Sequence, residues 1–238
     1  MTIPVANAHP LTGDKAPVTM GHEFCGRVTD ASSTSKFKAG QAVVADPRLY
    51  CRSCRRCGAN DTVTCDKWGF RGLSGGGGGF SQFVGIHESQ LYAIPDELRP
   101  YGALVEPLAV AWHAVKRAPI TDFSDQSCLI LGGGPIGIAL VLVLKVFGSK
   151  NIIVSEPTAT RRKQNEELAD HVLNPIDQNI GDECRKLTNG DGVDFVFDAA
   201  GVPRGFTAGV DAIKFKGWYI NVAGWEEPVS TDGSLIMD

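Results

Sequence analysis

The sequence predicts an α/β protein in which a parallel sheet fills the second half of the chain, while short strands with many turns fill the first half. Two observations support this fold class. Strand-like and helix-like segments alternate strictly from residue 128 onward, and such alternation is typical of a parallel sheet covered by helices on both faces. The 28 glycines and 13 prolines among 238 residues suit a chain rich in turns and argue against an all-helical fold.

In the first half we expect three short strands, each bounded by turn-forming residues. They cover residues 42–45, 83–86 and 91–94. The stretch 67–80 is dense in glycine, with five in a row from Gly75 to Gly79. We interpret it as a low-complexity loop, with a close approach of its backbone to a ligand or a metal loop as the alternative.

A helical pattern begins at Glu106. Pro107 suits the first turn of a helix, where its missing N–H costs nothing, and apolar residues then recur at helical spacing, at positions 108, 112 and 115. We place the domain boundary near Ala118, so that residues 1–118 form one domain and residues 119–238 form the other.

The second half is predicted to contain five strands and four helices in alternation. The strands cover residues 128–131, 151–155, 171–173, 193–198 and 218–223. The helices cover residues 137–147, 158–169, 177–187 and 202–215. Strands joined by helices in this order predict one parallel sheet.

The first strand of this sheet runs into a glycine-rich turn with the pattern G-x-G-x-x-G, formed by Gly132, Gly134 and Gly137. The pattern lies between a predicted strand and a predicted helix, as a dinucleotide-binding turn requires. The first glycine allows the tight turn, the second lets the backbone approach a pyrophosphate, and the third lets helix and strand pack closely. With Pro135 and Ile136, these are candidate coenzyme-binding residues, and the pyrophosphate would lie at the positive end of the helix dipole.

Glu156 ends the second strand, 19 residues after Gly137. This spacing is close to that of an acid that binds the adenosine ribose, and the alternative is a solvated carboxylate at a strand end. A carboxylate there repels a 2′-phosphate and favours NAD over NADP. Arg161, which we count among the coenzyme-binding residues, and Arg162 weaken that preference, unless both lie on a solvated helix face.

Four of the seven cysteines are clustered with the spacing C-x2-C-x2-C-x7-C. They are Cys51, Cys54, Cys57 and Cys65. Four thiolates so close together can surround one tetrahedral zinc and leave no open position, which predicts a structural site. The negative charge of such a cluster would be offset by Arg52, Arg55 and Arg56. The alternatives are a zinc module that binds nucleic acid and a chance crowding of cysteines.

Composition and charge argue against several classes of protein. A formal net charge of −4 gives no electrostatic reason to expect nucleic acid or an anionic membrane as a partner. No apolar run reaches the ~20 residues of a membrane helix, and residues 1–20 lack the pattern of a secretory signal. An odd number of cysteines favours a metal site with free thiols over a disulfide framework. We therefore expect a cytoplasmic protein that acts on a small molecule, with homo-oligomerisation left open.

Gly21-His22-Glu23 adds a third feature to the glycine fingerprint and the cysteine cluster. Together the three features resemble the zinc-dependent medium-chain alcohol dehydrogenases, whose zinc signature contains G-H-E. Residues 9–13, 104–113 and 155–157 are similar to the 2,3-butanediol dehydrogenase and sorbitol dehydrogenase branch, and the resemblance extends from residue 3 to residue 228.

The resemblance implies a partial GroES-like β-barrel domain that carries the structural-zinc lobe, joined to a Rossmann domain, with a catalytic zinc between them. It implies that His22 is a zinc ligand, that Glu23 is a ligand or near-ligand and that Glu106 takes the third position. The alternatives are a core histidine and a helix cap. No ligand role is implied for His113 or the other histidines. The implied reaction converts a secondary alcohol, a small diol or polyol, and a ketone into one another with NAD(H), with zinc as Lewis acid.

The chain departs from the family pattern at both ends. The family places a zinc-ligating cysteine and a proton-relay hydroxyl upstream of G-H-E, whereas the 21 residues before His22 include no cysteine. The chain also ends shortly after the fifth Rossmann strand, and Ser32 and Gln41 replace residues that are usually glycine and aspartate. The chain thus resembles the middle of a dehydrogenase. The alternative function is a remnant that binds zinc or nucleotide, and we expect these 238 residues alone to be a poor catalyst.

Overall fold

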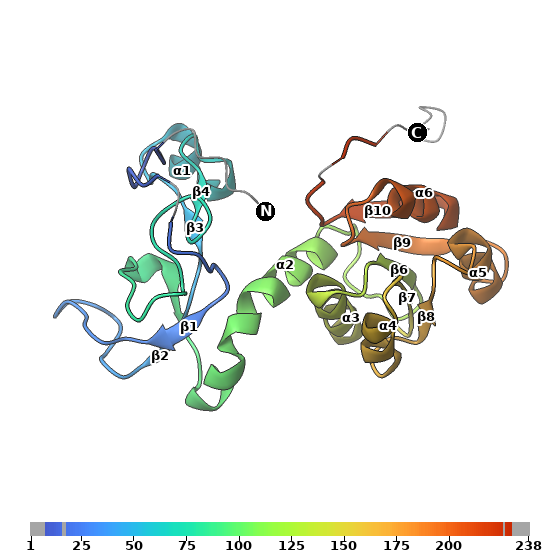
Figure 1. The fold of residues 1–238 in the computed structure, drawn as a ribbon, viewed down its shortest axis with the longest axis horizontal. Coiled ribbons are helices and arrows are strands. Elements are labelled where there is room, and N and C mark those ends of the chain that lie inside the picture. Colours follow the sequence, from blue (N-terminus) through green and yellow to red (C-terminus); the bar gives the residue numbers. More distant parts are fainter. Residues whose placement is uncertain (1–7, 16–17, 226, 230–238) are drawn as a thin grey trace. The chain divides into compact units, whose positions relative to one another are not determined.

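The computed structural model describes residues 8–15, 18–225 and 227–229. The chain divides into two compact units, Met1–Glu106 and Pro107–Asp238, which are described separately (Figure 1). The division falls inside helix α2 (Val105–Lys116), and the boundary expected near residue 118 lies just after the end of this helix. Within the described residues, no helix has the length and apolar character needed to cross a membrane.

The second unit is built on a five-stranded sheet in which all neighbouring strands run parallel, in the order β10-β9-β6-β7-β8. The strands are β6 (Ser127–Leu131), β7 (Asn151–Ser155), β8 (His171–Leu173), β9 (Val193–Asp198) and β10 (Ile213–Asn221). Successive strands are added outward from β6, first on one side and then on the other. Ligands bind such sheets at the carboxyl ends of the strands where this direction reverses, here β6 and β9.

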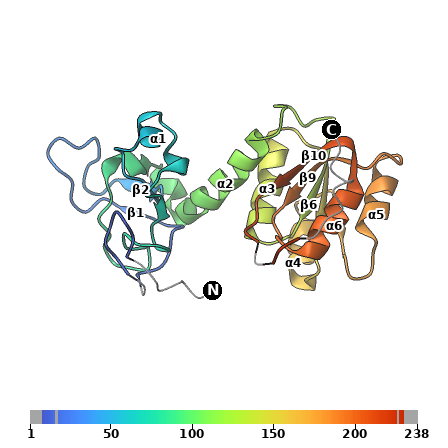
Figure 2. The same ribbon diagram turned by 90° about the horizontal axis from the view of Figure 1, so that it is seen from above.

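Helices cover both faces of this sheet, as predicted (Figure 2). On one face, α2 and α3 (Pro135–Val146) pack against Cys128 and Ile130. On the other face, α5 (Ile180–Leu187) and α6 (Pro203–Ala212) pack against Leu129 and Leu131. α4 (Ala159–Glu166) lies beside β8. Alternate residues of β6 therefore face opposite layers of helices, and all five are buried.

The prediction was wrong at the end of this unit. The helix expected at 202–215 ends at Ala212, and the strand expected at 218–223 begins at Ile213 as β10. Ile213 pairs with Val193, and the register then shifts before Trp218 pairs with Phe195. Residues 213–216 alternate apolar and charged side chains as a strand does, a signal that the prediction of a helix overlooked.

The first unit contains short strands and turns. Its main sheet is antiparallel, with the order β1-β2-β5, and consists of β1 (Cys25–Arg27), β2 (Ala42–Ala45) and β5 (Leu91–Ala93). A second pair consists of β3 (Arg48–Leu49) and β4 (Gly69–Phe70). The helical turns are α1 (Arg55–Gly58), η1 (Thr62–Thr64), η2 (Glu88–Gln90) and η3 (Asp96–Leu104). The prediction of a strand at 42–45 is confirmed, and all four residues are buried.

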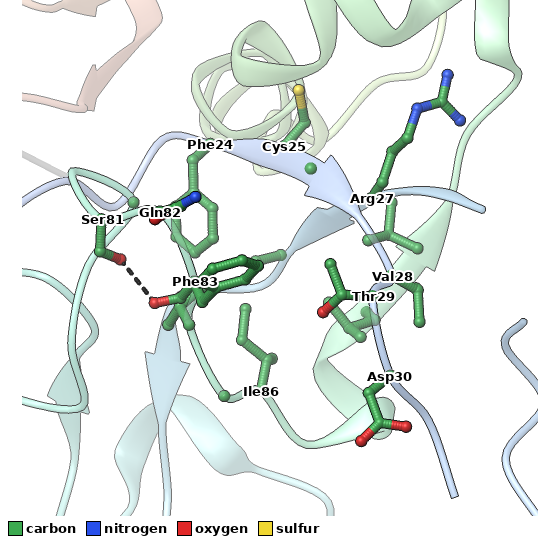
Figure 3. Close-up of a pocket in the computed structure, with 17 residues that line it drawn as sticks. Phe24, Cys25, Arg27, Val28, Thr29, Asp30, Ser81, Gln82, Phe83 and Ile86 are labelled. Carbon is green, nitrogen blue, oxygen red and sulfur yellow. Dashed lines mark hydrogen bonds between the residues drawn. The ribbon is translucent and has the colours of Figure 1, made fainter. Parts of the chain in front are cut away.

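The prediction of a strand at 83–86 is wrong, since this segment pairs with no strand in the described part of the chain. A cavity of about 320 Å³ lies between the segment and β1, lined by Phe24, Phe83 and Ile86 among others (Figure 3). Ser81 Oγ donates to the carbonyl oxygen of Phe83 (3.0 Å) and turns the start of the segment. The cavity separates the segment from β1, so no ladder forms between them. None of the candidate zinc ligands lines it.

Candidate functional site

The three candidate zinc ligands of the first unit converge. One donor atom from each of His22, Glu23 and Glu106 lies within 4.8 Å of the others, and His22 Nε2 lies 3.9 Å from Glu23 Oε1. His22 and Glu23 lie in the bend before β1, whereas Glu106 lies in the first turn of α2. An imidazole nitrogen and two carboxylate oxygens at these separations are donors that fit a zinc ion. The structure thus brings together all three residues that the resemblance implied.

The electrostatic environment of Glu106 favours a cation. Burial raises the pKa of Glu106 to about 7, and the carboxylates of Glu23 and Asp46 add to this shift. Asp46 is itself held by Arg48, with Nε 2.9 Å from Oδ1 and Nη2 2.6 Å from Oδ2. The negative charge of Asp46 is therefore compensated by Arg48, whereas Glu106 has no such cationic partner among the residues that the structure describes. Sequence reasoning missed Asp46 and Arg48, whose only signal is their position directly after the buried strand β2.

The glycine-dense segment holds the turn that carries His22. Gly79 N donates to Gly21 O (2.9 Å). A Cβ on Gly72 would lie 2.3 Å from Gly21 O, so only glycine permits this close approach. The segment is a loop of turns and bends, and its backbone closely approaches the turn that carries His22.

A buried arginine keeps this glycine-dense segment in place. Arg71 is 6% exposed, and its Nη1 donates to the carbonyl oxygens of Gly76 and Gly77. Phe70, the preceding residue, packs edge-on against the His22 ring, with ring centroids 5.2 Å apart. Sequence reasoning missed Arg71, because residue order alone does not show that a charged side chain points into the unit.

The four clustered cysteines form a second arrangement that fits a metal. Their Sγ atoms all lie within 4.8 Å of one another, and Cys51 Sγ lies 4.0 Å from Cys57 Sγ. Tetrahedral zinc with Zn–S bonds of ~2.3 Å places its sulfur ligands roughly 3.8 Å apart, so these thiols fit a zinc ion. None of the seven cysteines, all of them among the described residues, forms a disulfide.

Hydrogen bonds and burial shift the pKa values of the clustered cysteine thiols. The N–H groups of Cys54 and Cys57 donate to the sulfurs of Cys51 (3.3 Å) and Cys54 (3.5 Å). Hydrogen bonds from Ser53 lower the pKa of Cys51 to about 6, whereas burial and the neighbouring thiols raise the pKa of Cys57 to about 12. Thiols so close together cannot all be thiolates without a cation among them.

The turn between β6 and α3 has the geometry of a dinucleotide-binding turn. Gly132 adopts a φ of +90°, which favours glycine. A Cβ on Gly137 would lie 2.0 Å from Gly132 O, so the third glycine lets β6 and α3 pack. Within 4 Å, a Cβ on Gly134 would meet no described residue other than Arg161, whose guanidinium lies 3.7 Å away. The space beside Gly134 is thus open at the start of α3, where Pro135 is the first helical residue, and it fits a pyrophosphate.

Glu156 supports this turn from the end of β7. It is 2% exposed, and its Oε2 and Oε1 accept hydrogen bonds from Gly133 N (2.8 Å) and Thr158 N (2.7 Å). Burial by itself raises the pKa of Glu156, but the hydrogen bonds from Thr158 and Gly133 and the charge of Arg161 outweigh it, so this pKa lies below its usual value. The alternative of a solvated strand-end carboxylate is wrong.

The two arginines after Glu156 occupy different positions. Arg161 Nη1 lies 3.9 Å from Glu156 Oε2, and its side chain is 54% exposed. Arg162 Nη1 donates to the carbonyl oxygens of Glu156 (3.1 Å) and Pro157 (2.5 Å). Arg162 therefore holds the end of β7, whereas the guanidinium of Arg161 is accessible to an anion beside Gly134.

Both units match known protein families. Residues 4–96 match the alcohol dehydrogenase GroES-like domain, and residues 135–237 match the zinc-binding dehydrogenase family. The (R,R)-butanediol dehydrogenase of Bacillus subtilis is 36% identical over 229 residues, which cover 94% of this chain and 64% of that enzyme. The (R,R)-butanediol dehydrogenase of Neisseria gonorrhoeae is 35% identical over 239 residues, which cover 98% of this chain and 67% of that enzyme.

Solved structures agree with these matches. The 2R,3R-butanediol dehydrogenase from Bacillus subtilis superposes with a TM-score of 0.87 at 34% identity, covering 99% of this chain and 67% of that one. A zinc-binding dehydrogenase from Sinorhizobium meliloti bound to NADP superposes with a TM-score of 0.85 at 30% identity, covering 93% of this chain and 66% of that one. The chain thus spans 64–67% of the length of these relatives.

Proposed function

We propose a function on the premise that this chain belongs to the zinc-dependent medium-chain alcohol dehydrogenase family. The proposed reaction converts a secondary alcohol and a ketone into one another with NAD(H). The observation that carries it is the convergence of His22, Glu23 and Glu106 within 4.8 Å, in a chain that also contains a dinucleotide-binding turn.

The first unit would bind the reacting oxygen through a metal. His22, Glu23 and Glu106 would hold a zinc ion, which when bound supplies a Lewis acid for the alcohol or ketone oxygen. Glu106 has to lose its proton to become a ligand, because its pKa without a cation is about 7. The glycine-dense segment and Phe70 fix the turn of His22, so this donor is positioned before a metal arrives.

The cysteine cluster would hold a second zinc with a structural role. Four sulfurs fill a tetrahedral shell and leave no position for substrate. Arg56 supports this lobe, because its Nη1 donates to Thr64 O (2.7 Å) and lies 3.4 Å from Asp66 Oδ1. The zinc would therefore stabilise residues 51–65 rather than take part in the reaction.

The second unit would bind the coenzyme, which supplies the acceptor or donor of hydride. The pyrophosphate would lie against Gly132, Gly134, Pro135, Ile136 and Gly137. Each oxygen of Glu156 accepts one backbone hydrogen bond and keeps a lone pair for a ribose hydroxyl. Its negative charge favours NAD over NADP, whereas Arg161 would pair with a phosphate oxygen.

The substrate class is a small diol or polyol, a proposal supported by the similarity to butanediol dehydrogenases. Cysteine thiols can bind zinc only while they stay reduced, as they do in a reducing compartment, which supports a cytoplasmic location.

The test is NADH formation by the purified protein from (R,R)-2,3-butanediol and from sorbitol. Because these 238 residues alone are expected to be a poor catalyst, we expect weak turnover, and His22→Ala and Glu106→Ala should reduce it to background because each removes a metal ligand. His87→Ala and Glu97→Ala are matched controls, since both residues are exposed and outside the candidate site, and they should retain activity. A protein that binds zinc and NADH but oxidises neither alcohol would contradict the proposed reaction and support the non-catalytic alternative.

A further inference from the structure

The glycine fingerprint leaves one glycine of the coenzyme turn unexplained. The pattern G-x-G-x-x-G requires Gly132, Gly134 and Gly137 but permits any residue at position 133. Gly133 does not adopt the left-handed φ that would demand glycine. A Cβ on Gly133 would nevertheless lie 2.7 Å from Asn165 Nδ2, and 3.1 Å and 3.2 Å from Glu156 Cβ and Cγ. The glycine at position 133 is therefore explained by the side chains of Asn165 and Glu156, of which Asn165 makes the closer contact, and not by the fingerprint.

Asn165 is fully buried in α4 and reaches the turn from the next helix along the chain. Its Nδ2 donates to Gly133 O (2.9 Å) and to Arg161 O (2.8 Å), while its Oδ1 is buried and has no hydrogen-bond partner within the described ranges. A buried carbonyl oxygen without a hydrogen bond is unfavourable, and an apolar side chain would avoid it. Filling space therefore does not explain why an asparagine occupies this position.

The hydrogen bond from Asn165 sets the direction of a backbone donor. Gly133 O and Gly134 N–H belong to one trans peptide unit and point in opposite directions. Because Asn165 holds Gly133 O, Gly134 N–H points away from Asn165. No acceptor in the described part of the chain takes this N–H, and the space beside Gly134 is open. Gly133 N donates a hydrogen bond to Glu156 Oε2 (2.8 Å), so both the N–H and the carbonyl group of Gly133 are held by side chains.

We propose that Asn165 is a positioning residue that aims the Gly134 N–H group at the pyrophosphate of the coenzyme. The inference rests on the proposed function, since it concerns the coenzyme of that reaction. Asn165 touches only the turn, and its effect on the coenzyme passes through the Gly133–Gly134 peptide. Loss of its amide should weaken coenzyme binding without changing the groups that carry out the reaction.

Calorimetric titration, which measures the Kd of NADH, distinguishes a positioning role of Asn165 from a role in packing alone. Asn165→Ala should raise the Kd of NADH about tenfold, as expected for one lost hydrogen-bond anchor, and should lower Tm. It should raise KM for NAD and leave kcat unchanged. Asn179→Ala is the matched control, because it removes the hydrogen bond that caps α5 (Asn179 Oδ1 to Asp182 N, 3.1 Å). It should lower Tm and leave the Kd unchanged.

The double variant Gly133→Ala/Asn165→Ala separates the two roles. The added methyl group occupies part of the space left by the amide but still lies 3.1–3.2 Å from Glu156 Cβ and Cγ, so Tm should recover in part. Gly133 O still lacks its anchor, so the Kd should stay about tenfold above that of the wild type. Recovery of the Kd together with Tm, or an unchanged Kd in Asn165→Ala, would overturn the proposal. If the wild type bound neither NADH nor NADPH, the proposed function would be overturned, and this inference with it.

Discussion

The two units of this chain hold their candidate sites in different ways. In the second unit, the coenzyme turn joins the fully buried strand β6 to helix α3, so adjacent residues determine its shape. In the first unit, His22 lies in a bend whose conformation depends on glycines about fifty residues later in the chain. A site between two regular elements is therefore visible in local sequence, whereas a site on loops depends on contacts that the sequence does not show.

The units also differ in what stabilises them. The second unit buries apolar side chains on both faces of its sheet. The lobe of the first unit that carries the four clustered cysteines has one buried residue between Cys51 and Trp68, namely Cys65. A segment without its own apolar core needs another source of stability, such as a metal. We therefore expect the first unit to depend on zinc and the second to fold without it.

Removal of the structural zinc should produce the largest effect. Cys54→Ser should prevent tight binding of one zinc and unfold residues 51–68, because structural zinc contributes on the order of 10 kcal/mol to comparable small sites. Hydrogen exchange of the two units and elemental analysis would measure this. Cys25→Ser, which removes a thiol outside the cluster, should retain the zinc. A folded wild-type sample without zinc would show that the two units do not differ in this way.

Two glycines of the coenzyme turn should separate folding from binding in the second unit. Gly137→Ala should destabilise this unit by about 2–4 kcal/mol, because its Cβ would lie 2.0 Å from Gly132 O. Gly134→Ala should change stability by less than ~1 kcal/mol, since its Cβ meets only Arg161, yet weaken NADH binding at least ~10-fold by occupying the pyrophosphate space. Thermal unfolding and NADH titration distinguish them. Equal losses of stability in Gly137→Ala and Gly134→Ala would contradict the interpretation that the space beside Gly134 is open.

Local sequence could predict much of the second unit. β7, β8 and β9 have the predicted bounds, because each is a short apolar run between turn residues. The prediction was wrong at Ile213, where the strand begins directly after α6 with no turn residue between them. The coenzyme turn was recognised from its glycines, but Asn165 was not, because it contacts Gly133 from 32 residues away.

Less of the first unit could be predicted. The candidate ligands His22, Glu23 and Glu106 were identified from family resemblance, and their roles stay predictions although the structure brings them together. Arg71 was missed, because its burial depends on carbonyl groups of a loop. The segment 83–86 is a short apolar run between turns, yet a ladder also needs a neighbouring strand.

Acidification should weaken zinc binding at the His22 site. Without a cation the pKa of Glu106 is about 7, above its ordinary value of 4.5, so zinc must displace a proton below pH 7. The apparent zinc affinity should fall about tenfold per pH unit below 7 from this proton alone. The metal-free first unit should show the opposite trend and gain stability as pH falls from 7 towards 4.5, because the folded state disfavours the ionised carboxylate.

Chelator competition, with the cysteine cluster already loaded, would measure this affinity. Glu106→Gln should weaken zinc binding at all pH values and remove the contribution of this proton to its pH dependence. A zinc affinity independent of pH between about 5 and 7 would contradict the role given to Glu106.

The smallest effect should be a change of coenzyme preference. Glu156→Gln removes the negative charge that repels a 2′-phosphate and keeps most of the shape of the side chain, so NADPH should gain relative to NADH by about three- to tenfold. The gain is limited because Arg161, which lies 3.9 Å from the Glu156 carboxylate, is 54% exposed and water screens its attraction for a phosphate. Arg161→Ala in the Glu156→Gln background should reverse the gain. Glu166→Gln, an equal loss of charge from an exposed position on α4, should leave the ratio of the two Kd values unchanged.

Equal affinity of the wild type for NADH and NADPH would mean that Glu156 acts only on the glycine turn. Both Glu156 and Asn165 would then serve to hold Gly133, and coenzyme choice would depend on residues outside this turn.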